Sequence, residues 1–329
     1  MRAIQYRKFG SYDQLEAVDI PAPRPEPGEA LVRLQLAPVS PLDNTARAGH
    51  FPAAALKPFP LIPGVDGVGH IVESGSTDLS PGTPVLVWRL GSGTRRDGTW
   101  RELVTASASD LLPIPRGTSL ASVAAMTAGA GYLSAYLALT KVVPLVAGQT
   151  VLAPGIGGSV GQGGVEVARA LGASAAISTA SHTAKAELGR AAGFDVIDLS
   201  TESLREGVLR RTGGRGVDVV LDGVAGPVTG AAIASLAPGG ALVSIGYSGG
   251  TTATVNVTDL IWRTARVFGF MVSSFPQATI VEANRALLDL LARGQLHPTI
   301  GRTFPLAEAA EAQRYLIEDR PYGRVLLEI

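Results

Sequence analysis

The amino-acid sequence predicts an α/β protein in which a doubly wound parallel sheet accompanies a second domain of short strands. Its 329 residues correspond to about two domains at roughly 150 residues each. Residues 1–120 are rich in proline and contain short strand-forming runs separated by turns. After residue 120, continuous apolar runs alternate with helical segments of about ten residues, a pattern typical of a parallel sheet covered on both faces.

The composition excludes several classes of protein and partner. An apolar content of 46% excludes a disordered chain, and 40 glycines without a triplet repeat exclude collagen. Lys plus Arg and Asp plus Glu both number 28, so the charge indicates no nucleic-acid partner. The lack of cysteine excludes disulfides, thiolate zinc sites and iron–sulfur clusters, and four histidines leave little material for an all-histidine metal site.

No part of the sequence indicates a targeting signal or a membrane span. The first ten residues contain charges and no apolar core, unlike a signal peptide. The longest weakly polar stretch, 121–139, is interrupted by Gly129 and Gly131, so we do not expect it to cross a membrane. We therefore expect a cytoplasmic protein without a membrane partner.

The proline-rich first part predicts a small barrel or sandwich, because short strands with frequent turns are typical of those folds. The segment 21–29 can be neither helix nor central strand, since each proline fixes φ and lacks an N–H donor. The predicted strands of this part are 30–36, 70–73, 85–88 and 102–105.

The second part predicts a parallel sheet preceded by one helix, at 120–139. The predicted strands are 149–153, 175–179, 194–197, 217–221, 241–245 and 266–270. The predicted helices between and after them are 160–171, 183–192, 202–211, 228–236 and 277–293. A final helix at 306–318 and a strand at 324–329 break this rhythm, so we expect the last strand to join a different sheet.

A glycine-rich turn follows the first apolar strand of the second part. A dinucleotide needs such a turn, because its pyrophosphate approaches bare backbone at the N-terminus of the next helix. A purely structural turn is the alternative, but the position between a strand and a helix favours dinucleotide binding. The predicted cofactor-binding residues of this turn are Gly155, Gly157, Gly158, Ser159, Val160 and Gly161.

The residues after the next predicted strand indicate which dinucleotide binds. An NAD site carries an acidic residue about twenty positions after the glycines, where it holds the ribose 2′-hydroxyl. Here Ser181 stands at that position and Lys185 follows it, with no acidic residue before Glu187. A hydroxyl and an ammonium group suit a 2′-phosphate, so these two residues predict NADPH. The alternative is that Lys185 is an ordinary solvated lysine.

Several motifs in a fixed order resemble those of one family. Residues 63–69 read PGVDGVG, 71–75 read IVESG, 81–85 read PGTPV, 98–103 read GTWREL and 134–136 read SAY. Together with the glycine turn, these motifs resemble the medium-chain dehydrogenase/reductase superfamily. Within it, the sequence is similar to the zinc-independent quinone oxidoreductase branch, which includes zeta-crystallin, over nearly its whole length.

The resemblance implies a GroES-like catalytic domain formed by residues 1–120 with 297–329. It implies a Rossmann domain formed by residues 121–296, an NADPH cofactor and a substrate cleft between the domains. It further implies a homodimer or tetramer. The residues that the resemblance assigns to the nicotinamide are Ser134, Gly246, Phe270 and Val272.

The sequence departs from the zinc-dependent alcohol dehydrogenases of the same superfamily. Those enzymes hold zinc through cysteines and a Gly-His-Glu motif, whereas this chain has Ser40 and Asp66 at the corresponding places. A serine hydroxyl and one aspartate do not form an adequate zinc site. We therefore expect no metal and reject alcohol oxidation assisted by zinc. His70 is interpreted as a surface or rim histidine.

The substrate loop of the family is also altered here, since Ser40 and Phe51 replace the usual Asn and Tyr. For the aromatic residues of the predicted pocket, ordinary core packing is the alternative. The predicted substrate-lining residues are Ser40, Asn44, Phe51, Trp88 and Tyr247.

The resemblance implies an NADPH-dependent reductase of small-molecule quinones or α,β-unsaturated carbonyls. No histidine or lysine stands where the motifs place a general acid, so a proton for an enone would come from water or from Tyr247, a weak catalytic candidate. One alternative is an enoyl thioester reductase of the fatty-acid or polyketide type. The other is an NADPH-binding protein with little turnover.

Overall fold

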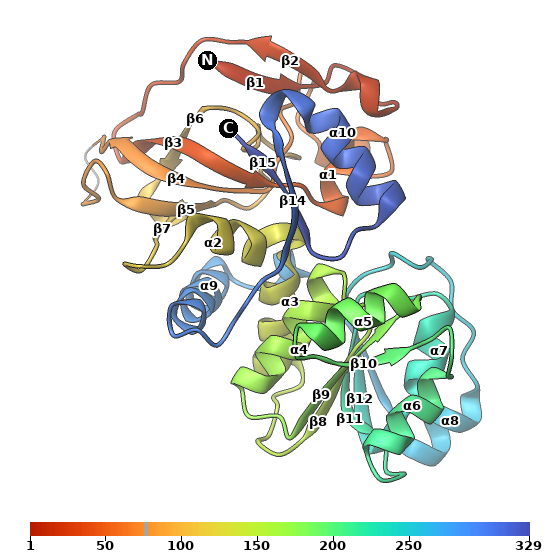
Figure 1. Cartoon of the computed structure of the whole chain (residues 1–329). Helices are drawn as coiled ribbons and strands as arrows, with labels where there is room; N and C mark the ends of the chain where they lie inside the picture. Colours follow the sequence, from red (N-terminus) through yellow and green to blue (C-terminus); the bar gives the residue numbers. More distant parts are fainter. Residues whose placement is uncertain (76–77) are drawn as a thin grey trace. The chain divides into compact units, whose positions relative to one another are not determined.

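The computed structural model describes residues 1–75 and 78–329, which form two compact units (Figure 1). Unit 1 comprises Met1–Gly129 and Pro298–Ile329, and unit 2 comprises Ala130–His297. The first junction lies after the predicted limit at residue 120, because helix α2 (Leu120–Thr127) packs against strands of unit 1. The change in composition at residue 120 therefore precedes the structural junction.

Unit 1 is built on a seven-stranded sheet in which β14, β15, β3, β4, β5 and β7 follow one another and β6 also pairs with β3. The ten-residue strand β3 pairs antiparallel with β15, β4 and β6, which makes it the centre of this unit. The last strand of the chain joins this sheet, as predicted. The strands are β3 (Glu29–Pro38), β4 (Asp66–Glu73), β5 (Pro84–Trp88), β6 (Leu103–Ser107), β7 (Leu111–Pro113), β14 (Ile300–Pro305) and β15 (Arg324–Glu328).

A separate hairpin and two further helices complete unit 1. The C-terminal helix predicted at 306–318 is divided into a 3-10 turn, α10 and a π-helical turn. The remaining strands and α-helices of this unit, apart from short 3-10 turns, are β1 (Arg2–Gln5), β2 (Glu16–Asp19), α1 (Pro41–Arg47) and α10 (Ala309–Arg314).

Unit 2 is a six-stranded parallel sheet in the order β10-β9-β8-β11-β12-β13, and it confirms the predicted fold class. The strands are β8 (Thr150–Ala153), β9 (Ala175–Ala180), β10 (Asp195–Asp198), β11 (Val217–Asp222), β12 (Leu236–Ser244) and β13 (Arg266–Gly269). Strand order reverses between β8 and β11, and the crevice at such a point is where open α/β sheets bind ligands.

The helices of unit 2 connect these strands in the alternation that the sequence predicts, with one addition, α8. They are α3 (Gly131–Leu137), α4 (Ser159–Ala170), α5 (Thr183–Ala191), α6 (Leu204–Arg211), α7 (Pro227–Ile233), α8 (Val257–Arg263) and α9 (Gln277–Ala292). Strand β8 is completely buried, which explains why its sequence is a continuous apolar run rather than an alternating one.

The single helix predicted at 120–139 is wrong. Gly129 and Ala130 take left-handed φ values of 64° and 52° and separate α2 from α3. After the break, α3 lies close to α4. A Cβ added at Gly131 would lie only 2.3 Å from the carbonyl carbon of Ser159. Residues Leu120–Val142 are apolar and long enough to cross a membrane, but 78% of the most apolar part is buried, as in a core helix.

One buried carboxylate lies where the chain enters and leaves unit 2. Glu166 of α4 accepts hydrogen bonds from the Tyr132 hydroxyl at 3.0 Å, the Gln162 amide at 3.2 Å and the His297 backbone N–H at 2.7 Å. Burial raises the pKa of this carboxyl, while the three donors act in the opposite direction. Tyr132 follows the first junction and His297 precedes the second.

Candidate active site

The glycine-rich turn joins β8 to α4 at the carboxyl edge of the parallel sheet. Gly155 has a φ of 85°, a conformation that side chains rarely adopt. A Cβ at Gly161 would lie 2.0 Å from the Gly155 carbonyl oxygen, so the turn closes only with glycine there. Gly158 precedes α4 with an ordinary φ of −88° and more space, since a Cβ would lie 3.3 Å from the same oxygen.

Hydrogen bonds hold this turn against the end of β9. The Gly155 N–H donates to the Thr179 hydroxyl at 3.1 Å, and the Ile156 N–H donates to the Thr179 carbonyl at 2.8 Å. Ser181 follows β9 directly and is exposed. The structure thus brings the predicted pyrophosphate turn and the predicted ribose-binding residue to the same edge of the sheet.

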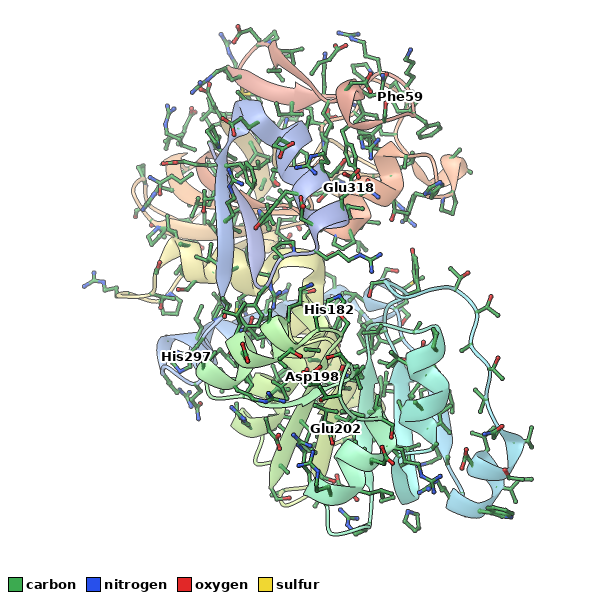
Figure 2. The ribbon with its side chains drawn as sticks, turned by 45° about the vertical axis from the view of Figure 1, so that its right-hand side comes forward. Phe59, His182, Asp198, Glu202, His297 and Glu318 are labelled. Atoms are coloured by element: carbon green, nitrogen blue, oxygen red, sulfur yellow. The ribbon has the colours of Figure 1, made fainter. Side chains whose placement is uncertain are left out.

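Lys185 lies in the first turn of α5 and is half-buried. Its N–H donates to the His182 carbonyl at 3.1 Å. The sequence analysis did not single out Asp198, a carboxylate at the carboxyl end of β10 (Figure 2). Hydrogen bonds from Ser200 and then Thr183 hold the pKa of Asp198 below its usual range, so it is an ionised group that is already bonded to hydroxyls.

The loops after β11 and β12 meet beside the glycine turn, which itself follows β8. The Ile245 and Gly246 N–H groups donate to the Asp222 carbonyl at 2.8 and 3.2 Å. A Cβ at Gly223 would lie 2.6 Å from Cβ of Val160, and a Cβ at Gly246 would lie 2.7 Å from the Gly223 carbonyl oxygen. The predicted residues Val160 and Gly246 therefore lie close together. Gly223 was missed, although a glycine directly after a strand is a recognisable signal.

The other residues assigned to the nicotinamide differ in their surroundings. The Phe270 N–H donates to the Ser244 carbonyl at 3.0 Å, next to the end of β12. Val272 begins a short 3-10 helix and is half-buried. Ser134 is buried within α3, which packs against α4.

The predicted substrate residues belong to both units: Ser40, Asn44, Phe51 and Trp88 lie in unit 1, and Tyr247 lies in unit 2. Ser40 is buried and caps α1: its hydroxyl donates to the Asp43 carboxylate at 2.7 Å, and the Asp43 N–H donates back to the hydroxyl at 3.4 Å. Trp88 is buried at the end of β5. Asn44 accepts a hydrogen bond from Arg47 at 2.6 Å, and Phe51 is half-buried. Tyr247, in unit 2, is 62% exposed.

Two buried aspartates lie near the Ser40 cap. Asp43 also accepts a hydrogen bond from the Gly64 N–H at 2.9 Å, yet burial raises its pKa to about 6. Asp66 is 1% exposed, and its Oδ1 has no hydrogen-bond partner. Burial, and secondly the neighbouring Asp43 charge, raise the pKa of Asp66 well above its usual range. Both effects favour the neutral form of the Asp66 carboxyl over the charged form.

These residues do not fit a zinc ion. Structural and catalytic zinc sites need three or four nitrogen, sulfur or carboxylate ligands. Both oxygens of Asp43 accept hydrogen bonds from Ser40 or Gly64. Across residues 1–75 and 78–329, no group of three or more His, Cys, Asp or Glu side chains could hold a metal ion.

Comparison with known proteins decides the family. Residues 26–116 match the family described as alcohol dehydrogenase GroES-like domain, and residues 193–327 match zinc-binding dehydrogenase. The chain is 30% identical over 334 residues to a quinone oxidoreductase of Pseudomonas aeruginosa, covering 99% of both proteins. The chain belongs to the zinc-independent quinone oxidoreductase branch of the medium-chain dehydrogenase/reductase superfamily. The predicted family is thus confirmed, and the protein is an oxidoreductase of this superfamily.

Solved structures of the superfamily are similar over the whole chain. A structure described as an NAD-dependent alcohol dehydrogenase has a TM-score of 0.88 and 27% identity, with 100% of both chains covered. A mycobacterial protein complexed with NADPH has a TM-score of 0.82 and 30% identity, again with 100% of both chains covered. Members of this superfamily with similar folds thus include proteins described with either nucleotide.

Proposed function

We propose that this oxidoreductase is an NADPH-dependent, zinc-independent reductase of quinones or α,β-unsaturated carbonyl compounds. The observation that carries the choice of nucleotide is the end of β9, where Ser181 and Lys185 stand in place of a ribose-binding acid. The description of the Pseudomonas aeruginosa relative as a quinone oxidoreductase supports the substrate class. The NADPH complex of the mycobacterial protein supports the nucleotide.

The residues of unit 2 suit the separate parts of such a cofactor. The glycine turn and the N-terminus of the twelve-residue helix α4 present backbone and a positive dipole end to a pyrophosphate. Lys185 would hold the 2′-phosphate, and the close approach of Gly246 to Gly223 leaves bare backbone for the nicotinamide end. The bound nicotinamide supplies the hydride. The chain contributes orientation, which by itself lowers the barrier of a two-reactant step.

A proton must follow the hydride when the substrate is an enone. Tyr247 has an exposed phenol in unit 2 and can donate that proton, as can water. A quinone takes its protons from solvent and requires no positioned acid. The proposed chemistry therefore needs neither a metal nor a histidine.

An NADPH oxidation screen over quinones, enals, enones and enoyl thioesters tests this function. We expect turnover with quinones or enones and at least about tenfold weaker binding of NADH, which corresponds to about 1.4 kcal/mol. Preferred turnover of enoyl thioesters would establish the alternative reductase of fatty-acid or polyketide type. Tight NADPH binding without oxidation by any substrate would establish a binding protein with little turnover. Equal affinity for NADH and NADPH would refute the choice of nucleotide.

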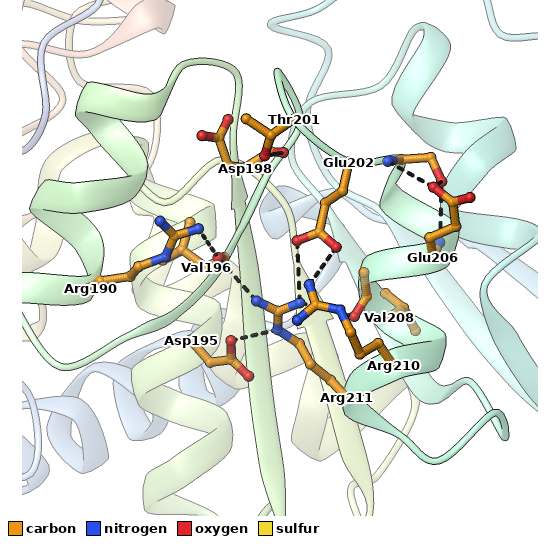
Figure 3. Close-up of polar contacts among 12 residues, drawn as sticks. Arg190, Asp195, Val196, Asp198, Thr201, Glu202, Glu206, Val208, Arg210 and Arg211 are labelled. Carbon is orange, nitrogen blue, oxygen red and sulfur yellow. Dashed lines mark hydrogen bonds and ion pairs between the residues drawn. The ribbon is translucent and has the colours of Figure 1, made fainter.

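The two edges of the unit 2 sheet support a homodimer. At the β10 edge, Arg190 and Arg211 donate to the Val196 carbonyl at 3.1 and 3.3 Å, and Arg211 also pairs with Asp195 at 2.6 Å (Figure 3). Guanidinium groups thus cover an edge that could otherwise accept another strand. Glu202 binds Arg210 and Arg211 beside this edge, extending the network (Figure 3).

The β13 edge has the opposite character. Val267 of β13 is 51% exposed and Trp262 of the preceding helix α8 is 79% exposed, with Ile261 and Met271 also exposed. An exposed strand with large apolar neighbours is typical of an interface. We propose a second copy of the chain as the occupant, related by a twofold axis. Light scattering should give a dimer for the wild type and a monomer for Val267→Lys. A monomeric wild type would refute this assembly.

We also propose that the protein acts in the cytoplasm on small molecules. Its balanced charge gives no support for a nucleic-acid partner. Fractionation of the native cell followed by immunodetection tests the location, and recovery in the membrane fraction would contradict it.

A further inference from the structure

Asp222 ends β11, one of the two strands between which the strand order of unit 2 reverses, and its side chain is completely buried. One carboxylate oxygen accepts hydrogen bonds from the Val224 and Ala225 N–H groups at 3.0 and 2.8 Å. The other oxygen accepts a hydrogen bond from the Thr229 hydroxyl at 2.5 Å. This side chain therefore fixes the path of the loop 223–226 between β11 and α7.

The loop 223–226 does not have a relaxed conformation. Ala225 has a left-handed φ of 61°, which an alanine adopts only at an energetic cost. Gly226 follows with the same φ, and a Cβ there would lie 2.6 Å from the Gly249 carbonyl oxygen. Strained residues persist only where the surrounding structure determines them, and they cluster at ligand sites. The hydrogen bonds to Asp222 hold this strained loop in place.

The loop 245–250 follows β12 and is held in turn by the residues after β11. The Ser248 hydroxyl donates to the Gly223 carbonyl at 3.3 Å. The Gly249 N–H donates to the Val224 carbonyl at 2.6 Å. This second loop carries both the backbone assigned to the nicotinamide and the exposed phenol that can donate a proton, so its position matters for the proposed reaction.

The loop 223–226 also contacts the glycine-rich turn. A Cβ at Gly155 would lie 3.1 Å from Cγ2 of Val224, and a Cβ at Gly223 would lie 2.6 Å from Cβ of Val160. All of these contacts lie within unit 2, at the carboxyl edge of its sheet. The loop 223–226 thus contacts both the turn proposed for the pyrophosphate and the loop proposed for the nicotinamide.

We propose that Asp222 is a positioning residue for the nicotinamide: by fixing the loop 223–226, it sets the position of the loop 245–250 beside the ring. This role rests on the nucleotide site of the proposed function, but not on the choice of NADPH or of the substrate. Both carboxylate oxygens of Asp222 have internal partners, so this residue acts through the backbone and not by touching the nucleotide. Hydride transfer is sensitive to small displacements, so loss of these hydrogen bonds should slow turnover more than it weakens binding.

The test compares Asp222→Ala with Asp218→Ala, a matched control near the opposite end of the same strand. Asp218 also holds backbone, since it accepts a hydrogen bond from the Thr150 N–H at 2.7 Å, but it does so at the amino edge of the sheet. Nucleotide binding is followed by the change in nicotinamide fluorescence of NADPH. A second ligand, 2′-phospho-ADP-ribose, lacks the nicotinamide and is titrated in competition.

We expect Asp222→Ala to lower kcat by at least about tenfold and to reduce the fluorescence change of bound NADPH. Its affinity for 2′-phospho-ADP-ribose should stay within about threefold of the wild type, because the pyrophosphate and ribose contacts are kept. Asp218→Ala should lower the unfolding temperature and leave kcat and both nucleotide measurements unchanged.

Two further variants keep the test decisive if Asp222→Ala does not fold. Gly249→Ala, at an exposed position, would place a Cβ 2.9 Å from Cγ1 of Val224. It should displace the loop 245–250 and reproduce the reduced nicotinamide fluorescence change without altering Asp222. Asp222→Asn keeps an oxygen for the two N–H donors and offers its amide to the Thr229 hydroxyl, which can accept, so it should keep most of the wild-type kcat and fluorescence change.

The proposal is overturned if Gly249→Ala and a folded Asp222→Ala both leave kcat and nicotinamide fluorescence as in the wild type. It is also overturned if Asp222→Ala and Asp218→Ala affect stability and kcat alike, as two purely structural carboxylates would. A wild type that binds NADPH without turnover would refute the proposed reductase, yet its fluorescence still tests Asp222. A wild type that prefers NADH is tested in the same way with NADH and ADP-ribose, and a wild type that binds neither nucleotide would overturn both proposals.

Discussion

Replacing Asp66 by asparagine should stabilise the protein at neutral pH and have the opposite effect in acid. Asp66 is buried and its Oδ1 lacks a partner, so the folded state favours the protonated carboxyl. A carboxyl whose pKa is raised by folding binds its proton more tightly in the folded state. Its stabilising contribution is therefore complete below the unfolded pKa and is lost as the pH rises through the folded pKa.

The magnitude follows from the unfolded chain, where an aspartate has a pKa of about 4. Each pH unit by which folding raises this pKa costs about 1.4 kcal/mol of unfolding free energy once the pH exceeds the folded pKa. Asparagine removes this cost but places an amide whose N–H donors lack partners, which costs about 1–3 kcal/mol. We expect a net gain at pH 7, where the cost of the buried carboxyl is largest, and a net loss of about 1–3 kcal/mol at pH 4, where only the cost of the amide remains.

Urea unfolding of the wild type and Asp66→Asn between pH 4 and pH 8 measures this difference. Asp19→Asn, at an exposed position of β2, is the control and should show little change with pH. The unfolding free energy of the wild type should fall with rising pH more steeply than that of Asp66→Asn. Equal destabilisation by Asp66→Asn at both ends of the range would refute the reasoning, because it would mean that the carboxylate is ionised and well paired.

Four further predictions concern the cofactor, the glycine turn and the metal. Lys185→Ala should raise the KM for NADPH by roughly ten- to a hundredfold, since a charge-assisted contact contributes about 1.5–3 kcal/mol. The kcat and the constants for NADH should stay unchanged. An unchanged KM for NADPH would disprove the contact between Lys185 and the 2′-phosphate. Gly158→Val should abolish nucleotide binding measured by fluorescence titration while the protein stays folded. Gly161→Ala should lower the unfolding temperature, because its Cβ would lie 2.0 Å from a backbone oxygen. If instead Gly158→Val unfolded the protein and Gly161→Ala left its unfolding temperature unchanged, the roles assigned to the two glycines would be wrong. Elemental analysis should find no stoichiometric zinc, and a chelator should leave activity unchanged, whereas one zinc per chain would overturn this expectation.

The parallel sheet could be predicted because its physical cause lies in local sequence. Strands buried on both faces are continuous apolar runs, and Gly155 and Gly161 mark the turn between β8 and α4. The break at Ala130 could not be predicted, because an alanine with positive φ is unfavourable by itself. The break accompanies close packing of Gly131 against Ser159 of α4, a helix that lies further along the sequence.

The candidate substrate loop shows a different limit. Ser40, with Pro41 next and Asp43 three residues later, is a recognisable helix-capping pattern, so its structural role could have been inferred. The burial of two neighbouring carboxyls, Asp43 and Asp66, could not be inferred, because it depends on tertiary packing and on the Gly64 N–H, which donates to Asp43. Local signals identify caps and turns, whereas the charge state of a buried carboxyl depends on tertiary packing.

The position of Glu166 suggests that unit 2 can be exchanged as a module. Because one carboxylate bonds both Tyr132 and the His297 backbone, the two ends of this unit are held beside each other on α4. A segment with adjacent ends can be inserted into a host loop without stretching the host. The segment 130–297 is therefore a natural cassette for chimaeras in which nucleotide preference is transplanted between relatives, provided that the donor segment keeps its own carboxylate and both of these donors.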